Sequence, residues 1–243
     1  MPLALITGGS RGVGAALAHE LAGRGYRLLL CGRDTEALDR VASALPQATA
    51  VPCDLADAAQ LRLLAEESAR LGELSLLVNN AAVQDVYELG DLTPDEGCDR
   101  IGREIAINLT GTLQLTAHCL PLLRARPGSR IVNVTSGLAI APKRRAAVYC
   151  ATKAALRTFT RSLRYQEQAA ASGVAVTEAV LPLVDTAMTA GRGSGKISPA
   201  EAARAIVRGI EGNRDEVYVG KAKLLNVLYR VSPRLSYLTT RDG

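Results

Sequence analysis

Residues 7–14 read TGGSRGVG, and they stand between a short apolar run, residues 3–6, and a segment with helical periodicity. The glycines at positions 8, 12 and 14 permit a tight turn, and they let backbone N–H groups approach a pyrophosphate at the start of a helix. Because glycine is common in any tight strand-to-helix turn, the position of the stretch at the first such junction carries the information. It predicts a dinucleotide-binding strand–turn–helix unit at the beginning of the chain.

Short apolar runs alternate with helical patterns along the rest of the chain. We expect further strands at residues 28–31, 49–51, 74–78, 130–134, 174–180 and 216–219. These runs lack strict polar–apolar alternation, which is typical of strands buried on both faces. Each parallel crossover needs a helix to return, so the alternation indicates a parallel sheet. The prediction is an α/β protein, a three-layer αβα Rossmann fold with a seven-stranded, mostly parallel sheet, in one domain of residues 1–243.

Composition narrows the class of protein. Of 243 residues, 48% are apolar and 22% charged, which excludes a disordered chain. The net charge of +5 favours anionic small molecules but is too small for a nucleic-acid-binding surface. Five scattered cysteines and two histidines offer no metal site, and no apolar run is long enough to span a membrane. We therefore expect a cytoplasmic protein without a signal peptide, a metal, a nucleic-acid partner or membrane contact.

The end of the second predicted strand favours NADP over NAD. Gly32 and Arg33 stand where an enzyme that prefers NAD usually carries an acid. Arg33, together with Arg11 in the glycine stretch, suits the 2′-phosphate of NADP through charge-assisted hydrogen bonds. The alternative is that Arg33 is a solvated surface residue. Asp34 is expected to cap the helix that follows, contact with the cofactor ribose being the alternative.

Polar clusters also follow the third and fourth predicted strands. Asp54 and Leu55 come after the third strand, and Asn79, Asn80 and Ala81 come after the fourth. Taken singly, Asp54 is typical of a cap or turn, and the asparagine pair of an Asx turn. Because ligands bind at the carboxyl ends of parallel strands, their joint position favours a site for adenine and ribose.

An acid–base constellation follows the fifth strand. Ser136 comes just after the strand, and Tyr149 and Lys153 lie four residues apart on one face of a predicted helix. A phenol with a pKa of about 10 is a weak acid at neutral pH, and a nearby ammonium lowers that pKa. The pair can give a proton to a carbonyl as hydride arrives, with Ser136 bound to the same oxygen. In isolation, a tyrosine and a lysine at this spacing are commonly an ordinary surface pair.

Taken together, these residues resemble the short-chain dehydrogenase/reductase family, over essentially the whole chain. The matching residues are TGGSRGVG at 7–14, Asp54, Asn79–Ala81, Asn108, Ser136, Tyr149 and Lys153. The resemblance implies NAD(P)-linked carbonyl–alcohol chemistry. It gives Tyr149 the role of proton donor or acceptor, and Lys153 the roles of lowering its pKa and binding the nicotinamide ribose. It makes Ser136 the binder of the substrate oxygen and Asn108 the anchor of a water relay to Lys153.

The resemblance also implies a cofactor site. Its expected residues are Gly8, Ser10, Arg11, Gly12, Val13, Gly14, Arg33, Asp54, Leu55, Asn80, Ala81, Tyr149, Lys153, Pro182, Val184 and Thr186.

One motif departs from the family pattern. The family commonly has Pro-Gly after the sixth strand, whereas this chain has Pro182-Leu183, and leucine narrows the backbone conformations beside the nicotinamide carboxamide. Thr186 is still expected to reach that carboxamide. The sequence Leu-Val-Asp-Thr at 183–186, with residues 219–225, resembles the DltE-like branch of the family. Residues 187–197 form a short glycine-rich segment, expected to be a mobile substrate lid.

The substrate end is less determined. We expect an NADPH-dependent ketoreductase acting on a small-molecule carbonyl or alcohol, with NAD(H) less favoured. Residues 143–145 read Lys-Arg-Arg and suit an anionic or carrier-bound substrate, a solvated basic turn being the alternative. The amphipathic tail, residues 221–243, is expected to cover the cleft or a second subunit rather than a membrane. Helical patterns at 99–125 and 149–170 resemble those that pair subunits in the family, so a homodimer or homotetramer is expected.

Two other functions stay open. The first is a redox-neutral or non-redox enzyme on the same fold, such as an isomerase or dehydratase, which the altered Pro182-Leu183 motif favours. The second is an NADP-sensing module without turnover. The complete set of Ser136, Tyr149 and Lys153 argues against a sensor, because binding alone needs no proton-transfer groups.

Overall fold

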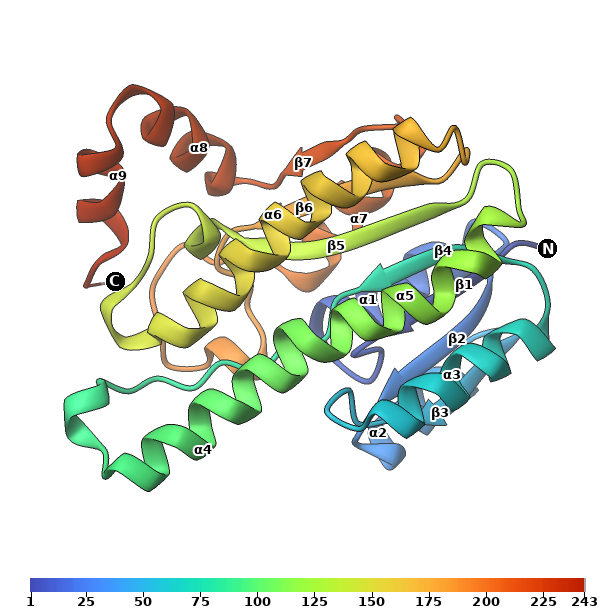
Figure 1. Ribbon diagram of the computed structural model, residues 1–243, viewed down its shortest axis with the longest axis horizontal. Helices are drawn as coiled ribbons and strands as arrows, with labels where there is room; N and C mark the ends of the chain where they lie inside the picture. Colours follow the sequence, from blue (N-terminus) through green and yellow to red (C-terminus); the bar gives the residue numbers. More distant parts are fainter. Residues whose placement is uncertain (243) are drawn as a thin grey trace.

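The computed structural model describes residues 1–242 and contains one seven-stranded sheet (Figure 1). The strand order is β3-β2-β1-β4-β5-β6-β7, and every neighbouring pair is parallel. The order reverses at β1, which lies between β2 and β4, and this creates a switch point where ligands bind in such sheets. The predicted Rossmann architecture is confirmed. The strands are β1 (Leu3–Thr7), β2 (Arg27–Gly32), β3 (Ala48–Pro52), β4 (Leu74–Asn79), β5 (Arg130–Ser136), β6 (Ala175–Leu181) and β7 (Glu216–Tyr218).

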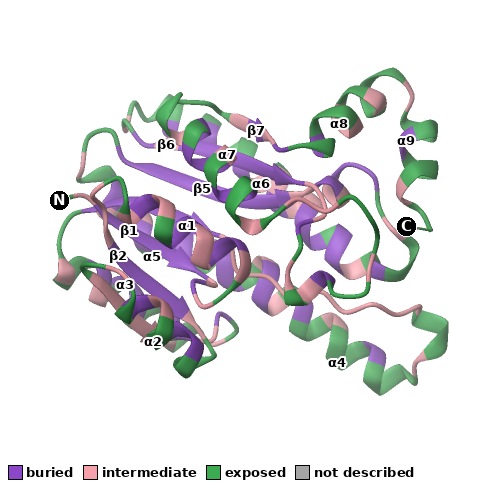
Figure 2. Cartoon of the chain, turned by 180° about the vertical axis from the view of Figure 1, so that it is seen from behind, coloured by how far each residue is buried: buried purple, intermediate pink, exposed green. Residues whose placement is uncertain are grey.

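Helices cover both faces of the sheet. The apolar sides of α1, α2 and α7 pack on one face, and those of α3, α5 and α6 pack on the other. Figure 2 shows the strands buried between these two helical layers. Within residues 1–242, no helix is long and apolar enough to cross a membrane. The helices are α1 (Gly12–Ala22), α2 (Thr35–Ser43), α3 (Ala58–Leu71), α4 (Pro94–Ile105), α5 (Gly111–Arg124), α6 (Ala147–Ala169), α7 (Pro199–Glu211), α8 (Lys221–Val231) and α9 (Pro233–Thr240).

Local sequence signals explain where several helices begin. The Asp34 carboxylate accepts a hydrogen bond from the Ala37 N–H at 3.0 Å and so caps α2, as expected. Thr93 and Glu96 form a capping box at α4, and Ser198 and Glu201 form another at α7. In both of these helices the residue after the cap is proline, which suits the first helical position.

A π-helical segment interrupts the long helical pattern that precedes β5. Residues Ala106–Thr110 join α4 to α5, and Asn108 lies at the centre of this segment, completely buried. The widened turn is followed by Gly111, which packs directly on the loop after β3. A Cβ at Gly111 would overlap the Leu55 carbonyl oxygen and lie 2.8 Å from the carbonyl carbon. The interruption therefore brings the α4–α5 helix against the sheet edge where the predicted site lies.

We predict that Gly111→Ala destabilises the protein by about 1–3 kcal/mol, because the added methyl group must displace backbone rather than a flexible side chain. Gly102→Ala in α4 is the matched control, since apart from its chain neighbours and the surrounding helix backbone no atom of residues 1–242 lies within 4 Å of a Cβ there. The free energy of unfolding of this control is expected to equal that of the wild type or to exceed it by up to about 1 kcal/mol. Urea unfolding followed by circular dichroism measures both. Equal stability of the two variants would show that the packing at Leu55 is not restrictive.

Candidate active site

The glycine stretch forms the floor of the predicted cofactor site. Gly12 has a φ of +56°, and a Cβ at Gly14 would overlap the Gly8 carbonyl oxygen, so side chains are excluded where the turn enters α1. No side chain among residues 1–242 caps the start of α1. Its first backbone N–H groups therefore suit a ligand pyrophosphate, favoured further by the helix dipole. The cradle fits a dinucleotide.

One cavity of about 1350 Å³ runs from this stretch across the carboxyl ends of the strands. It gathers residues from β2, β5 and β6, from the loops that follow β1, β3 and β4, and from helices that include α1, α6 and α8. Of the residues predicted for cofactor and catalysis, only Gly14 and Asn108 do not line it. Those that do are Gly8, Ser10, Arg11, Gly12, Val13, Arg33, Asp54, Leu55, Asn80, Ala81, Ser136, Tyr149, Lys153, Pro182, Val184 and Thr186.

The structure divides the two arginines expected at the 2′-phosphate position. Arg11 forms an ion pair with Asp34 across the mouth of the cavity, while Asp34 also caps α2. Arg33 is exposed, lines the cavity, and has no ion pair within the part of the chain that the structure describes. Asp34 is thus already engaged twice, and Arg33 is the cation that is free to meet a ligand.

The polar residues after β3 and β4 form different kinds of hydrogen bond. Asp54 accepts a hydrogen bond from the Ala56 N–H at 3.0 Å, the turn contact that its position favours. Asn80 donates to the Thr7 carbonyl at 2.9 Å, and Asn79 donates to Asn133 at 2.8 Å, so both side chains bind other strands instead of closing an Asx turn. These contacts join the end of β4 to β1 and β5, and so fix the centre of the cavity floor.

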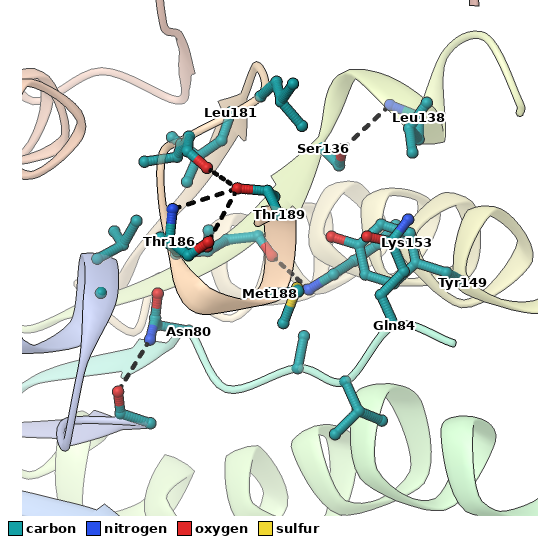
Figure 3. Close-up of a pocket in the computed structure, with 18 of the residues that line it drawn as sticks. Asn80, Gln84, Ser136, Leu138, Tyr149, Lys153, Leu181, Thr186, Met188 and Thr189 are labelled. Carbon is teal, nitrogen blue, oxygen red and sulfur yellow. Dashed lines mark hydrogen bonds between the residues drawn. The ribbon is translucent and has the colours of Figure 1, made fainter. Parts of the chain in front are cut away.

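Tyr149 and Lys153 lie on one face of α6, and both are buried in the wall of the cavity (Figure 3). The Lys153 Nζ atom is 5.8 Å from the centre of the Tyr149 ring and donates a hydrogen bond to the Val134 carbonyl at 2.9 Å. Burial raises the pKa of Tyr149 to about 12 and lowers the pKa of Lys153 to about 8. Burial thus shifts the phenol pKa upward, in the direction opposite to the lowering expected from the ammonium.

Ser136 stands at the end of β5, next to this pair. Its hydroxyl accepts a hydrogen bond from the Leu138 N–H at 3.1 Å. The hydroxyl of Ser136 lowers the pKa of Tyr149, against the larger effect of burial, and both residues line the same cavity. A carbonyl oxygen placed between the two hydroxyl groups can meet both donors at once.

Asn108 lies behind the cavity wall and does not line it. Its side chain exchanges two hydrogen bonds of 2.8 Å with the backbone N–H and carbonyl of Val83, and its Nδ2 lies 3.4 Å from the Thr152 hydroxyl. Asn108 therefore holds the segment after β4 at a fixed distance from α6. The water relay to Lys153 stays a prediction.

Glu104, one helical turn before Asn108, is a residue that the sequence reasoning missed. Its side chain is fully buried and accepts a hydrogen bond from the Asp85 N–H at 3.2 Å. Burial raises the pKa of this carboxyl group. The only sequence signal for Glu104 is that it stands four residues before Asn108, which places both on one face of a helix.

The segment after β6 folds back over the cavity. Val184 pairs with Ile197, and the Thr189 hydroxyl donates to the Val184 carbonyl at 2.5 Å. Leu183, the residue that departs from the family pattern, lies against the lid: a Cβ at Gly193 would be only 2.5 Å from its side chain. The leucine therefore occupies space that the glycine leaves open. The mobility of residues 187–197 stays a prediction.

A contact across the cavity was not foreseen from the sequence. Arg192 in the lid donates a hydrogen bond to the Gln84 side chain at 3.0 Å, and so joins the lid to the segment after β4. Both residues line the cavity, and Gln84 is among the residues labelled in Figure 3. The only sequence signal for this contact is that Arg192 stands between two glycines of the lid.

The basic stretch and the tail also meet at the substrate end. Lys143 lines the cavity, whereas Arg144 is near Asp242 at 3.5 Å and Glu88 at 3.7 Å. From α8, Leu225 and Leu228 line the cavity, so this part of the tail borders the cleft. In the part of the chain that is described, no three His, Cys, Asp or Glu side chains form a group able to hold a metal.

Comparisons with known proteins agree with this geometry. A short chain dehydrogenase family model matches residues 2–196. The uncharacterized oxidoreductase DltE of Bacillus subtilis is 39% identical over 185 residues, which cover 76% of this chain and 72% of that protein. A fatty acyl-CoA reductase of Acinetobacter baylyi is 30% identical over 253 residues, covering 99% and 83%. A short chain dehydrogenase from Burkholderia cenocepacia, solved in complex with NADP, superposes with a TM-score of 0.87 at 27% identity and covers 100% and 98%.

Proposed function

Since this chain belongs to the short-chain dehydrogenase/reductase family and is an NAD(P)-dependent oxidoreductase, we propose that it reduces an aliphatic ketone to a secondary alcohol with NADPH. The observation that carries the proposal is the buried pair of Tyr149 and Lys153, which faces Ser136 in a cavity that begins at the glycine stretch.

The cofactor would be held by groups along the cavity floor. The N–H groups at the start of α1 suit the pyrophosphate, Arg33 suits the 2′-phosphate, and Asp54 lies where the adenosine is expected. Lys153 and Thr186 also line the cavity and would bind the nicotinamide end of the cofactor. When bound, NADPH supplies the hydride for the carbonyl carbon.

Tyr149 supplies the proton. With a pKa of about 12, its phenol is protonated at pH 7 and can donate to the carbonyl oxygen, while Ser136 holds that oxygen by a hydrogen bond. Lys153, with a pKa of about 8, is mostly protonated at pH 7, and its positive charge stabilises the tyrosinate that remains. At pH 7 the phenol thus carries the proton that reduction of a carbonyl requires. Oxidation of an alcohol requires the tyrosinate and is favoured as the pH rises.

Two features support NADPH as the reductant. The only acid at the end of β2, Asp34, is engaged by Arg11 and by the start of α2, which leaves Arg33 available for a phosphate. The Burkholderia cenocepacia relative was solved with NADP.

Aliphatic side chains indicate the character of the substrate. The end of the cavity beyond Tyr149 is walled by residues from five different segments, and none of them is aromatic, so apolar contact replaces ring stacking there. They are Val83, Leu138, Leu183, Met188, Leu225 and Leu228.

We predict that Tyr149→Phe lowers kcat by about 10²- to 10⁴-fold, because the proton donor is removed while the ring that packs in the wall is kept. NADPH oxidation is followed at 340 nm against ketones, diketones and β-ketoacyl thioesters. Tyr165→Phe, on the same helix but 60% exposed, is the control and should keep wild-type activity. Wild-type rates in Tyr149→Phe would reject Tyr149 as the proton donor.

Cofactor selectivity has its own test. Arg33→Ala should raise the KM for NADPH by about tenfold or more and leave the KM for NADH unchanged, because only NADPH carries the 2′-phosphate. Arg40→Ala, an exposed change on α2 away from the cavity lining, controls for the loss of a surface charge. An equal effect of Arg33→Ala on both cofactors would remove Arg33 from the phosphate site.

A further inference from the structure

Some of the charged residues that line the cavity have ion-pair partners, and others have none within residues 1–242. Three of its acidic residues have basic partners: Asp34 with Arg11, Asp85 with Arg103 at 3.6 Å, and Asp185 with Lys196 at 3.2 Å. At the substrate end, Lys143 and Arg192 also line the cavity. Neither has an ion-pair partner anywhere in residues 1–242.

Lys143 and Arg192 line the same cavity from two separate segments. Lys143 precedes the turn that leads into α6, and Arg192 lies in the lid, held by its hydrogen bond to Gln84. Both side chains are half-buried. The pKa of Lys143 is lowered by burial and then by the charges of Arg192 and Arg145. The charge of Arg192 also opposes the raised pKa of Tyr149, and the two residues line the same cavity.

Two half-buried like charges repel each other, and an anion between them would relieve that repulsion. The planar guanidinium of Arg192 suits the paired oxygens of a carboxylate or phosphate, and the ammonium of Lys143 adds a point charge. The pyrophosphate cradle at α1 and the exposed Arg33 are separate features of the cavity, so these two cations are not needed for the cofactor's phosphates.

We propose that the substrate is an aliphatic carbonyl compound with an anionic group, and that Lys143 and Arg192 bind this group beside Tyr149. The inference rests on the proposed function and names its substrate class. The apolar wall formed by Leu138, Leu183 and Leu225 accommodates the aliphatic part. Arg144 has no share in this site, because it is occupied by Glu88 and Asp242.

Binding of small probes tests the proposal without any turnover. Isothermal titration calorimetry compares hexanoate, hexyl phosphate and neutral hexanamide on the full-length protein. Hexanoate or hexyl phosphate should bind at least tenfold more tightly than hexanamide, and the tighter of the two anions identifies the group that the site prefers. Arg192→Gln and Lys143→Gln should each weaken anion binding about tenfold and leave hexanamide unchanged.

Lys223→Gln is the matched control, since it removes the same charge from α8 at a residue outside the cavity lining. Its anion affinity should equal that of the wild type. Equal binding of anionic and neutral probes, no binding of either anion, or the same loss in Lys223→Gln would each overturn the proposal.

Turnover separates this inference from the proposed function. NADPH oxidation is measured with 3-oxohexanoate and with its methyl ester. A preference for the acid that disappears in Arg192→Gln supports both proposals. Equal reduction of acid and ester keeps the reductase function and overturns the anion site. Anion binding that depends on Arg192, without reduction of any ketone in the panel, overturns the reductase function and leaves the anion site standing.

Discussion

Removal of water from around Tyr149 and Lys153 is the constraint on which the chemistry of this site depends. Burial disfavours the charged form of each group, so it raises the pKa of the phenol to about 12 and lowers that of the ammonium to about 8. The tyrosine is therefore held as an acid, and the lysine is brought close to neutral pH. The end of β5 adds Ser136, which lines the same cavity and whose hydroxyl lowers the pKa of Tyr149 against the effect of burial.

The scaffold keeps this pair in register with the cofactor cradle. Thr7 at the end of β1 accepts hydrogen bonds from the Asn80 and Ala81 N–H groups at 2.9 and 3.0 Å, which joins the glycine stretch to the floor after β4. Behind the wall, Asn108 binds Val83 and approaches Thr152, the neighbour of Lys153. The π-helical segment gives Asn108 this position, so a local irregularity of the helix serves the geometry of the site.

Periodicity and strand-end motifs predict the sheet, the glycine stretch and the Tyr149–Lys153 pair, because each of these depends on residues close together in the sequence. Contacts between distant segments escape such reasoning. Asp34 forms an ion pair with Arg11 in the neighbouring turn, and Arg192 donates a hydrogen bond to Gln84, which is 108 residues away in the sequence. The Pro182-Leu183 departure is explained only by the fold, since the leucine side chain lies where Gly193 leaves room. The Asn108 side chain likewise forms hydrogen bonds with the backbone N–H and carbonyl of Val83, a residue that no motif marks.

The most direct test of the buried pair is an NMR titration of the lysine side chains between pH 6 and pH 10. The Lys153 signal is assigned by its loss in Lys153→Met. Our account predicts a midpoint of about 8 for Lys153, while exposed lysines titrate near the usual value of about 10.4. A midpoint for Lys153 at or above that usual value would contradict the account, because the ammonium would then be solvated and the wall around Tyr149 would be open to water.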